Sequence, residues 1–467
     1  MAGTPFLLLA AIILCPRPAF AWWEHTLLTL AATRNLELPD QRVPVESLED
    51  FLKEGPALRQ ALIEMDAAFA SIPAYPPISA SLQFDPGAAD LRQSFLQAIR
   101  INPDTRLLPY IQYPTRAPAG CRAVDYHRIT FLKDVDYLKG VPFCAIRPGQ
   151  MVSARDVLVS ASDEPDYGHD IGLFEDNDTE AGSEYGFGIQ PFGNPNLEYS
   201  SQAPFHMGFY HESGLVYALA GFLKQTYAQY RALQYLELAR FAFRTGHDYW
   251  GYRFLGWGLH YVQDLTQPYH ATVMPSRSSA GMIWINVLNT IGISGPQTGA
   301  VQLLSNRHLA LENYQRNLML DLYKHEFSDT EKDHSAGNRD GSEGNNGNPD
   351  AGNAPTRGYS PKQIMDALSN MTNDSDYDFR KPGYIREIVA GEAAKEAPDL
   401  DEMLSEALPE PVAHDPEHIY EGVEESDNMY RILKEKQKSA ALAEKLLPLF
   451  RSVGIHTRNY IRLGTTE

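Results

Sequence analysis

The sequence predicts an all-α protein, and three observations support this fold class. Apolar residues recur about every three to four positions across residues 214–264, which is the spacing of one helix face. Alternating patterns typical of half-buried strands are scarce. Residues 22 to about 115 are typical of helices separated by proline-rich connections, and helical patterns return from residue 360 onward. With 467 residues and 43% hydrophobic content, the chain can form a large core.

The first 21 residues have the pattern of a secretory signal peptide. An apolar run at residues 6–14 is too short to span a bilayer and is followed by prolines and the small residues around Ala21. We therefore expect residues 1–21 to be removed and the mature protein to be secreted or periplasmic. No further segment has the length of a transmembrane anchor, so none is expected.

Cleavage after Ala21 makes Trp22 the first residue of the mature chain, with His25 close behind it. A free α-amino group titrates at about pH 7.7–8.0, so a zinc ion can displace its proton and bind the nitrogen. The amine and carbonyl of Trp22, together with His25, therefore form one candidate metal site. The alternative interpretation is an exposed aromatic terminus.

The most informative motif spans residues 260–270. An apolar stretch without proline precedes it, so a helix can continue through His260 and Asp264, which lie four residues apart and share one face. Pro268 then breaks the helix and lets His270 approach from another side. Imidazole and carboxylate are good zinc ligands, so this segment predicts ligands for two adjacent metal ions. The alternative is an ordinary core histidine with two chance neighbours.

A second pair repeats the four-residue spacing. Residues 305–314 predict a helix that begins with Ser305 or Asn306 as its cap and carries His308 and Glu312 on one face. Taken alone, this pair fits a surface helix. Together with the motif at residues 260–270, it predicts a further part of a metal centre.

With these residues, the chain resembles the zinc-dependent phospholipase C superfamily, which also contains the single-strand-specific zinc nucleases. The resemblance rests on an N-terminal tryptophan with a histidine after it, on the His-xxx-Asp-xxxxx-His spacing of residues 260–270, and on the His308–Glu312 pair. The glutamate form of that pair is typical of the phospholipase branch. The resemblance implies a multi-helix phospholipase C/nuclease-like fold with long loop insertions.

The resemblance also implies an early aspartate and a further histidine. Asp166, in the segment Glu164-Pro165-Asp166-Tyr167, fits the aspartate best, with Asp163 as the rival. His206 has the better local context for the histidine, whereas His211 has the more usual distance to His260. We favour His206.

Carried over to this chain, the resemblance implies three zinc ions. Their expected ligands form three groups: Asp166, His206, His260 and Asp264; His270, His308 and Glu312; Trp22, His25 and the bridging Asp264. Clustered zinc neutralises phosphoryl charge and lowers the pKa of a bound water, as hydrolysis of a phosphodiester requires. The resemblance gives Asp166 the role of orienting the attacking water or accepting its proton.

The substrate is expected to be a phospholipid at a membrane surface. The resemblance places Tyr167 in the wall of a headgroup pocket, where an aromatic face suits a quaternary ammonium. The formal net charge of −20 and the lack of a Lys/Arg cluster do not favour a nucleic-acid partner. The sequence does not indicate an oligomeric state.

Several segments lie outside the motifs. Residues 281–293 are apolar and fit either a buried helix, which we favour, or an element that dips into lipid. Residues 329–358 are rich in Gly, Asn, Asp and Ser, which predicts a polar loop or linker between a catalytic domain at 22–328 and a helical region at 359–467. Cys121 and Cys144 are an even pair, and a disulfide between them is expected.

The sequence therefore predicts a secreted zinc-dependent phosphodiesterase. Phospholipase C activity on a glycerophospholipid such as phosphatidylcholine is the first choice. A zinc nuclease or 3'-nucleotidase that acts on single-stranded nucleic acid is the alternative. The third interpretation is a secreted zinc protein without catalytic activity.

Overall fold

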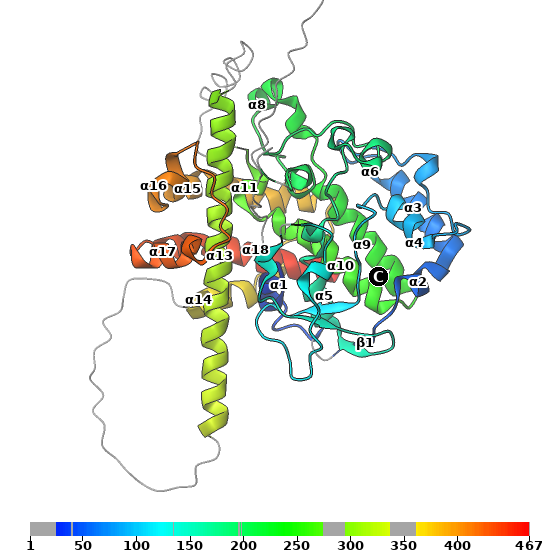
Figure 1. Cartoon of the computed structure of the whole chain (residues 1–467), viewed down its shortest axis with the longest axis horizontal. Coiled ribbons are helices and arrows are strands. Elements are labelled where there is room, and N and C mark those ends of the chain that lie inside the picture. The colour runs from blue at the N-terminus through cyan, green and yellow to red at the C-terminus, as the bar shows by residue number, and fades with distance from the viewer. Residues whose placement is uncertain are drawn as a thin grey trace, which may run out of the picture.

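The protein is mostly helical, which confirms the predicted all-α class (Figure 1). The computed structural model describes residues 25–38, 41–133, 135–194, 197, 199–273, 295–336 and 361–466. The predicted signal peptide, Trp22, the apolar residues 281–293 and residues 337–358 of the predicted linker lie outside these ranges. Among the helices that the structure describes, none has both the length and the apolar character needed to cross a membrane.

Helix α10 (Asp248–Asp264) is the centre of the molecule and is buried from Tyr249 to its end. Three helices pack around it: α9 (Ala228–Arg244), α5 (Ala154–Ala161) and α18 (Ser439–Thr465). Gly256 allows the close approach of α5, because a Cβ there would lie 2.6 Å from the Cβ of Ala161. The apolar run that the sequence shows before His260 is therefore the core-facing part of this helix.

The N-terminal helices build the main core on one side of α9 and α10. They are α2 (Leu48–Phe51), α3 (Gly55–Phe69) and α4 (Leu91–Ala98). The first helix, α1 (His25–Ala32), instead packs its apolar residues into the second core, which the C-terminal helices form. Aromatic rings of Phe51, Trp250 and Phe254 pack against one another in the main core. As predicted, helices and connections alternate over this region.

The C-terminal helices form a second core around the long helix α13 (Gly295–Ala336). They are α14 (Pro361–Ser369), α15 (Ala390–Ala407), α16 (Glu410–His414), α17 (Met429–Glu435) and α18. Helix α18 also contacts α1 and α10, so the C-terminal region packs on the same body as the N-terminal helices (Figure 1).

Helix α13 differs from the prediction at both ends. It begins at Gly295, so the predicted start with Ser305 or Asn306 as cap is wrong. The side chain of Asn306 is buried and binds Gln302, His418 and Tyr420 instead. The helix continues to Ala336, so the predicted boundary between residues 328 and 329 falls within it.

Short elements connect the layers. They include the helices α6 (Glu180–Glu184), α7 (Ala203–His206), α8 (Gly214–Leu219) and α11 (Pro268–Ala271) and the 3-10 helices η6 (Glu164–Tyr167) and η9 (Gly221–Lys224). Two small antiparallel sheets pair β1 (Arg42–Pro44) with β4 (Met151–Ser153) and β2 (Tyr110–Gln112) with β3 (Phe143–Ala145). The expected disulfide joins Cys121 to Cys144 on β3.

Candidate metal centre

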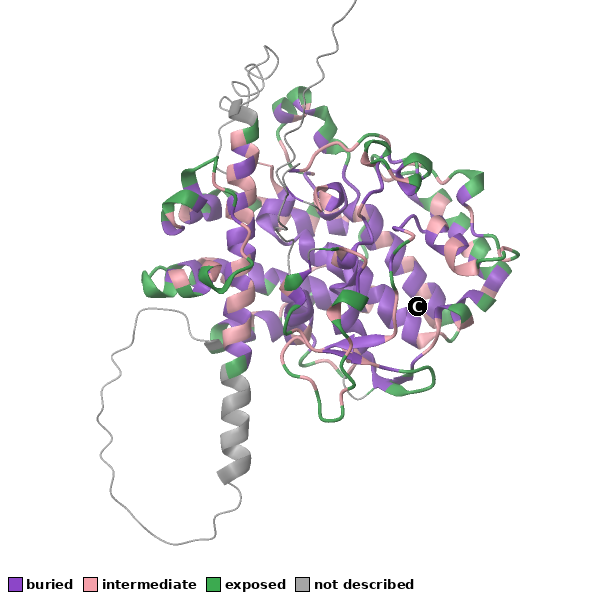
Figure 2. Cartoon of the chain, viewed as in Figure 1, coloured by how far each residue is buried: buried purple, intermediate pink, exposed green. Residues whose placement is uncertain are grey.

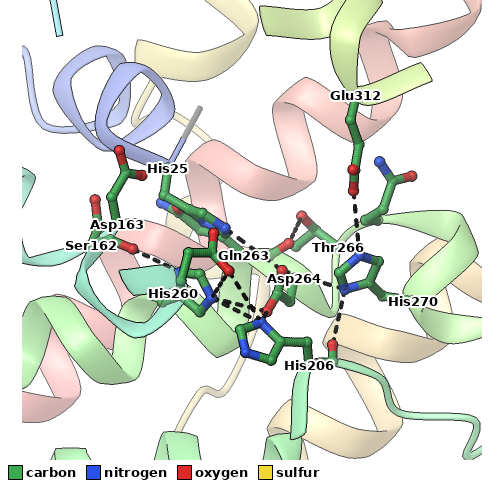
Figure 3. Close-up of polar contacts among 12 residues, drawn as sticks. His25, Ser162, Asp163, His206, His260, Gln263, Asp264, Thr266, His270 and Glu312 are labelled. Carbon is green, nitrogen blue, oxygen red and sulfur yellow. Dashed lines mark hydrogen bonds and ion pairs between the residues drawn. The ribbon is translucent and has the colours of Figure 1, made fainter. Parts of the chain in front are cut away.

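Six elements bring histidines and carboxylates to one buried place beside the end of α10 (Figure 3). Each element contributes one or two side chains: His25 from α1, Asp166 from η6, His206 from α7, His260 and Asp264 from α10, His270 from α11, and His308 and Glu312 from α13. Every described residue that the sequence predicts as a metal ligand is therefore in this cluster.

The break after α10 has the predicted cause and the predicted effect. Helix α10 ends at Asp264, and Pro268 opens the next short helix at its first position, where a missing N–H is tolerated. The turn brings His270 back toward the helix end, so that its Nδ1 lies 3.3 Å from Asp264 Oδ1. One short segment thus supplies ligand groups on two sides of Asp264.

Asp264 lies at the middle of the cluster. Its Oδ1 is 3.6 Å from His25 Nε2, on the same side as His270, whereas its Oδ2 is 2.9 Å from His206 Nδ1. The two oxygens therefore face different groups of histidines. This is the geometry that a carboxylate shared between two metal ions requires.

The first group surrounds Asp264 Oδ2. His260 Nε2 lies 3.4 Å from this oxygen and 3.0 Å from His206 Nδ1. Asp166 Oδ1 is 3.7 Å from His260 Nε2 and 3.8 Å from His206 Nδ1. The Asp166 side chain is 13% exposed, so it lies at the edge of the group that solvent reaches.

The second group joins α11 and α13. The Nε2 atoms of His270 and His308 face each other at 2.9 Å, and Glu312 Oε1 lies 2.7 Å from His308 Nε2 and 3.4 Å from His270 Nε2. His308 and Glu312 are one turn apart on α13, as their spacing predicts. Two imidazole nitrogens at this distance need a proton or a cation between them.

Four of the histidines are held through one ring nitrogen, which leaves the other to face the cluster. His260 Nδ1 donates to the carbonyl of Ser162, and His270 Nδ1 donates to that of His206. His25 Nδ1 lies 2.9 Å from Gln263 Oε1, and His206 Nε2 lies 3.5 Å from Asp170 Oδ2. Such outer partners are typical of metal-binding histidines, because they fix the ring and its tautomer.

Burial favours the neutral form of several of these imidazoles. It lowers the pKa of His25 and of His308 to about 4, and that of His260 well below its ordinary value. Neutral imidazole is the form that binds a metal. His206 differs, because Asp264 and Asp170 outweigh its burial and raise its pKa to about 10. Positive charge is thus favoured next to these two carboxylates.

The donor set fits divalent cations. Both oxygens of Asp264 and both of Glu312 are buried without a hydrogen-bond partner among the described residues, although histidine nitrogens approach them. Buried carboxylates are costly unless a cation or hydrogen bonds compensate. Three groups of described residues can each hold an ion within a 4.8 Å span: His25, Asp166 and His260; His206, His260 and Asp264; His270, His308 and Glu312.

The rival residues lie elsewhere. His211 Nε2 contacts the carbonyl of Arg386 at the surface, so His206, which we favoured, is the histidine in the cluster. Asp163 accepts hydrogen bonds from Thr26 and from Gln112 Nε2, the latter at 2.6 Å, and burial raises its pKa to about 7. Asp163 therefore supports α1, whereas Asp166 faces the histidines.

Tyr167 does not have the predicted position in a headgroup pocket. Its ring is buried against Phe143, and its hydroxyl donates to Gln112 Oε1 at 2.7 Å. The reason is local, because η6 turns through about a third of a circle per residue and so points neighbouring side chains in different directions. Asp166 and Tyr167 are adjacent in sequence but serve different parts of the protein.

A pocket of about 290 Å³ opens beside the cluster and reaches His206, His270 and His308. Its walls are mostly apolar and include Phe192 and Leu223, and no Lys or Arg is among the described residues that line it. Tyr199 and Tyr269 add aromatic surface to its lining, and the hydroxyl of Tyr269 donates to Asp401.

The sequence did not reveal the outer partners of the histidines. Asp170 is held by Arg231 Nη2 at 2.6 Å and by the hydroxyl of Tyr261 at 2.6 Å, so it has a fixed position next to His206. Gln263 also donates to Thr29 and Thr457. Tyr261 and Gln263 lie inside the motif at 260–270. Their role in holding the outer partners and rings of the histidines becomes visible only from their contacts with distant segments.

The chain matches no protein family, characterised protein or solved structure in the comparisons made.

Proposed function

We propose that the chain is a secreted zinc-dependent phosphodiesterase of the phospholipase C type, which hydrolyses the glycerol–phosphate bond of a glycerophospholipid. One observation carries the proposal: the cluster of histidines and carboxylates adjoins a pocket with apolar walls, and three of its histidines line that pocket. The resemblance of the sequence motifs to the zinc-dependent phospholipase C superfamily supports the same reaction.

The residues of the cluster would hold up to three zinc ions. His206, His260, Asp166 and Asp264 would hold one ion, and His270, His308 and Glu312 a second. His25 and Asp264, whose Nε2 and Oδ1 atoms lie 3.6 Å apart, would hold a third together with Trp22, which the sequence resemblance adds. Bound zinc would supply charge neutralisation at the phosphoryl oxygens and a water of lowered pKa. Asp264 would serve two of these ions, because its oxygens face different histidines.

The protein side chains would position and deprotonate the attacking water. Asp166 lies within 3.8 Å of two histidines of the cluster and keeps contact with solvent, so it is placed to orient a water and accept its proton. Asp170, Gln263 and the carbonyl of Ser162 would hold the rings in place during the reaction.

The pocket favours a lipid over a polynucleotide. The apolar walls suit the acyl chains of a diacylglycerol leaving group, whereas a polynucleotide needs cationic contacts to its phosphates. The net charge of −20 also opposes a polyanion. Export through a signal peptide is part of the proposal, and the Cys121–Cys144 disulfide is consistent with it.

Metal analysis of the mature protein, with parallel assays on phosphatidylcholine and single-stranded DNA, tests the proposal. We expect zinc in the protein and release of phosphocholine. Bound zinc with release of neither product would leave a non-catalytic zinc protein, and cleavage of DNA alone would make it a nuclease.

The variant His206→Asn tests the assignment of the site. It should lose zinc and lower kcat/KM by at least about 100-fold, because loss of outer partners alone typically reduces activity or metal affinity by about 10- to 100-fold. His211→Asn is the matched control, since that histidine lies five residues on and outside the cluster. Equal activity of the two variants would contradict the assignment.

A further inference from the structure

Helix α8 lies at the outside of the molecule, where much of it is exposed (Figure 2). In α8 and the following η9, the exposed residues include large apolar side chains. Leu215 is 46% exposed, Leu219 is 42% exposed and Phe222 is 41% exposed. We call these three residues the outer face. Large apolar side chains are seldom gathered on the surface of a soluble protein without a binding role.

The same segment is also apolar on its inner side. Val216, Ala220 and Leu223 are buried and form a small core with Phe209, against which Met207 packs. Burial of these inner residues is therefore sufficient to hold the segment on the rest of the protein. The outer face adds nothing to that core, and a short helix that is apolar all round is typical of a membrane-associated or covered element.

The outer face is continuous with the pocket of the metal centre. Phe222 belongs to both, and Ala220 and Leu223 line the pocket from the inner side of the same segment. His206, His270 and His308 also line the pocket. An apolar surface thus runs from the outside of α8 toward the histidines.

The charge of this segment differs from that of the whole chain. Residues 213–225 contain no Asp or Glu, although the chain has 60 acidic residues and a net charge of −20. The single cation, Lys224, lies with its ammonium 4.9 Å from the centre of the Tyr217 ring. A tyrosine and a lysine beside apolar side chains suit the boundary between lipid headgroups and hydrocarbon.

We infer that the outer face of α8 and η9 docks into a phospholipid surface and sets the mouth of the pocket against it. The inference rests on the proposed function for the identity of the surface. A zwitterionic surface is the expected partner, because the net charge of the protein opposes an anionic one. A lipid that leaves such a surface would move along apolar walls into the pocket.

Sedimentation with phosphatidylcholine vesicles tests the inference on the full-length mature protein. The double variant Leu215→Ser, Leu219→Ser removes most of the outer face and leaves every pocket residue in place. We expect its partition coefficient to be at least about tenfold lower than that of the wild type, since each leucine loses apolar area that lipid would cover. Its melting temperature should not fall, because both residues are exposed.

The control variant is Met151→Ser, Ile419→Ser, which removes two apolar side chains that are 47% and 45% exposed on other elements. It should bind vesicles like the wild type. Equal vesicle binding by the wild type and the Leu215, Leu219 variant would overturn the inference. So would a dimer in light scattering that this variant alone abolishes, because the face would then join two copies.

Hydrolysis of a soluble short-chain phosphodiester separates this inference from the proposed function. We expect the Leu215, Leu219 variant to hydrolyse it at the wild-type rate. If neither protein hydrolyses any phosphodiester but only the wild type binds vesicles, the docking surface stands and the proposed function fails.

Discussion

At the scale of single residues, the cluster concentrates groups that a metal-free core would not favour. Burial disfavours the ionised Glu312 and raises its pKa to about 7, and its two oxygens have no hydrogen-bond partner among the described residues. His308 and His270 nevertheless face it within 3.4 Å. Such an arrangement reduces stability unless a cation binds it.

The variant Glu312→Gln tests this trade-off. In the metal-free protein, the amide removes a disfavoured carboxylate, so the melting temperature should stay the same or rise by a few degrees. Zinc should raise the melting temperature of the variant less than that of the wild type. A ligand stabilises a protein by binding its native state, and the variant lacks one of the carboxylates that would bind zinc. Calorimetry with and without zinc measures both effects. Glu387→Gln, at an exposed side chain, should change neither, and an unchanged zinc response of Glu312→Gln would exclude this ligand.

The sequence could predict those site residues that lie close together in the chain, because local backbone geometry determines how they are arranged. His260, Asp264 and His270 were found because helix periodicity and one proline determine where they point. Asp170 was missed because its role depends on Arg231, which is 61 residues away. Tyr167 was misplaced because the resemblance of its sequence context indicates a position in the chain but not the direction in which the ring points.

At the scale of elements, the candidate metal centre depends on the close packing of α5 and α10. A Cβ at Gly256 would lie 2.6 Å from the Cβ of Ala161 and 2.7 Å from the carbonyl oxygen of Leu158. This carbonyl oxygen is part of the backbone of α5, so it cannot move away unless the helix moves with it. The distance between α5, which leads to Ser162, and α10, which carries His260, is therefore set by the absence of a side chain.

Gly256→Ala should push these helices apart. We expect a loss of about 1–3 kcal/mol in the free energy of unfolding, in spite of alanine's better helix propensity, and weaker zinc binding. Urea unfolding and zinc titration measure the two effects. The matched control is Gly214→Ala at the start of α8, where a Cβ meets nothing within 4 Å and stability should not fall. Equal stability of both variants would show that the helices can adjust.

Helix existence was easier to predict than helix limits. The pattern at residues 305–314 resembles a helix start because Asn306 is a good cap, yet its side chain serves a tertiary contact inside α13. A side chain that can cap a helix can also bind a distant backbone group. For Asn306, the folded position of His418, whose carbonyl accepts from the Asn306 side chain, shows that the side chain makes a tertiary contact and does not cap a helix.

At the scale of the whole molecule, the helical class followed from periodicity, but the arrangement of the layers did not. Residues 25–32 form a short helix with an ordinary sequence, and no feature of that sequence predicts that the helix packs against α18. Such pairings depend on complementary surfaces between segments hundreds of residues apart.

The acid stability of the molecule should depend on the seam between α15 and α18. Burial alone would raise the pKa of Glu392, but hydrogen bonds from His456, Tyr377 and Ser452 lower it to about 2. Because the folded pKa lies below the unfolded value, this stabilisation is present above about pH 4.5 and is lost as the pH falls toward 2. The side chain is 32% exposed, so the contribution is on the order of 1–2 kcal/mol.

Glu392→Gln should therefore lower the free energy of unfolding at pH 7, and its difference from the wild type should shrink between pH 4.5 and 2. Denaturant unfolding at several pH values measures this difference. Glu444→Gln, at an exposed position on α18, should show no such trend. A difference that stays constant with pH would contradict the assignment.

The contact between α1 and α18, the first and last described helices, also determines when during synthesis the candidate metal centre can form. Arg458 donates to the carbonyl of Ala32, across 426 residues, and Gln263 holds both Thr29 and Thr457 beside His25. During synthesis, His25 leaves the ribosome long before α18 exists to hold α1 in place. The candidate metal centre can therefore be completed only after synthesis is almost finished, so a metal ion that needs the complete site would bind late, after the last helix has formed.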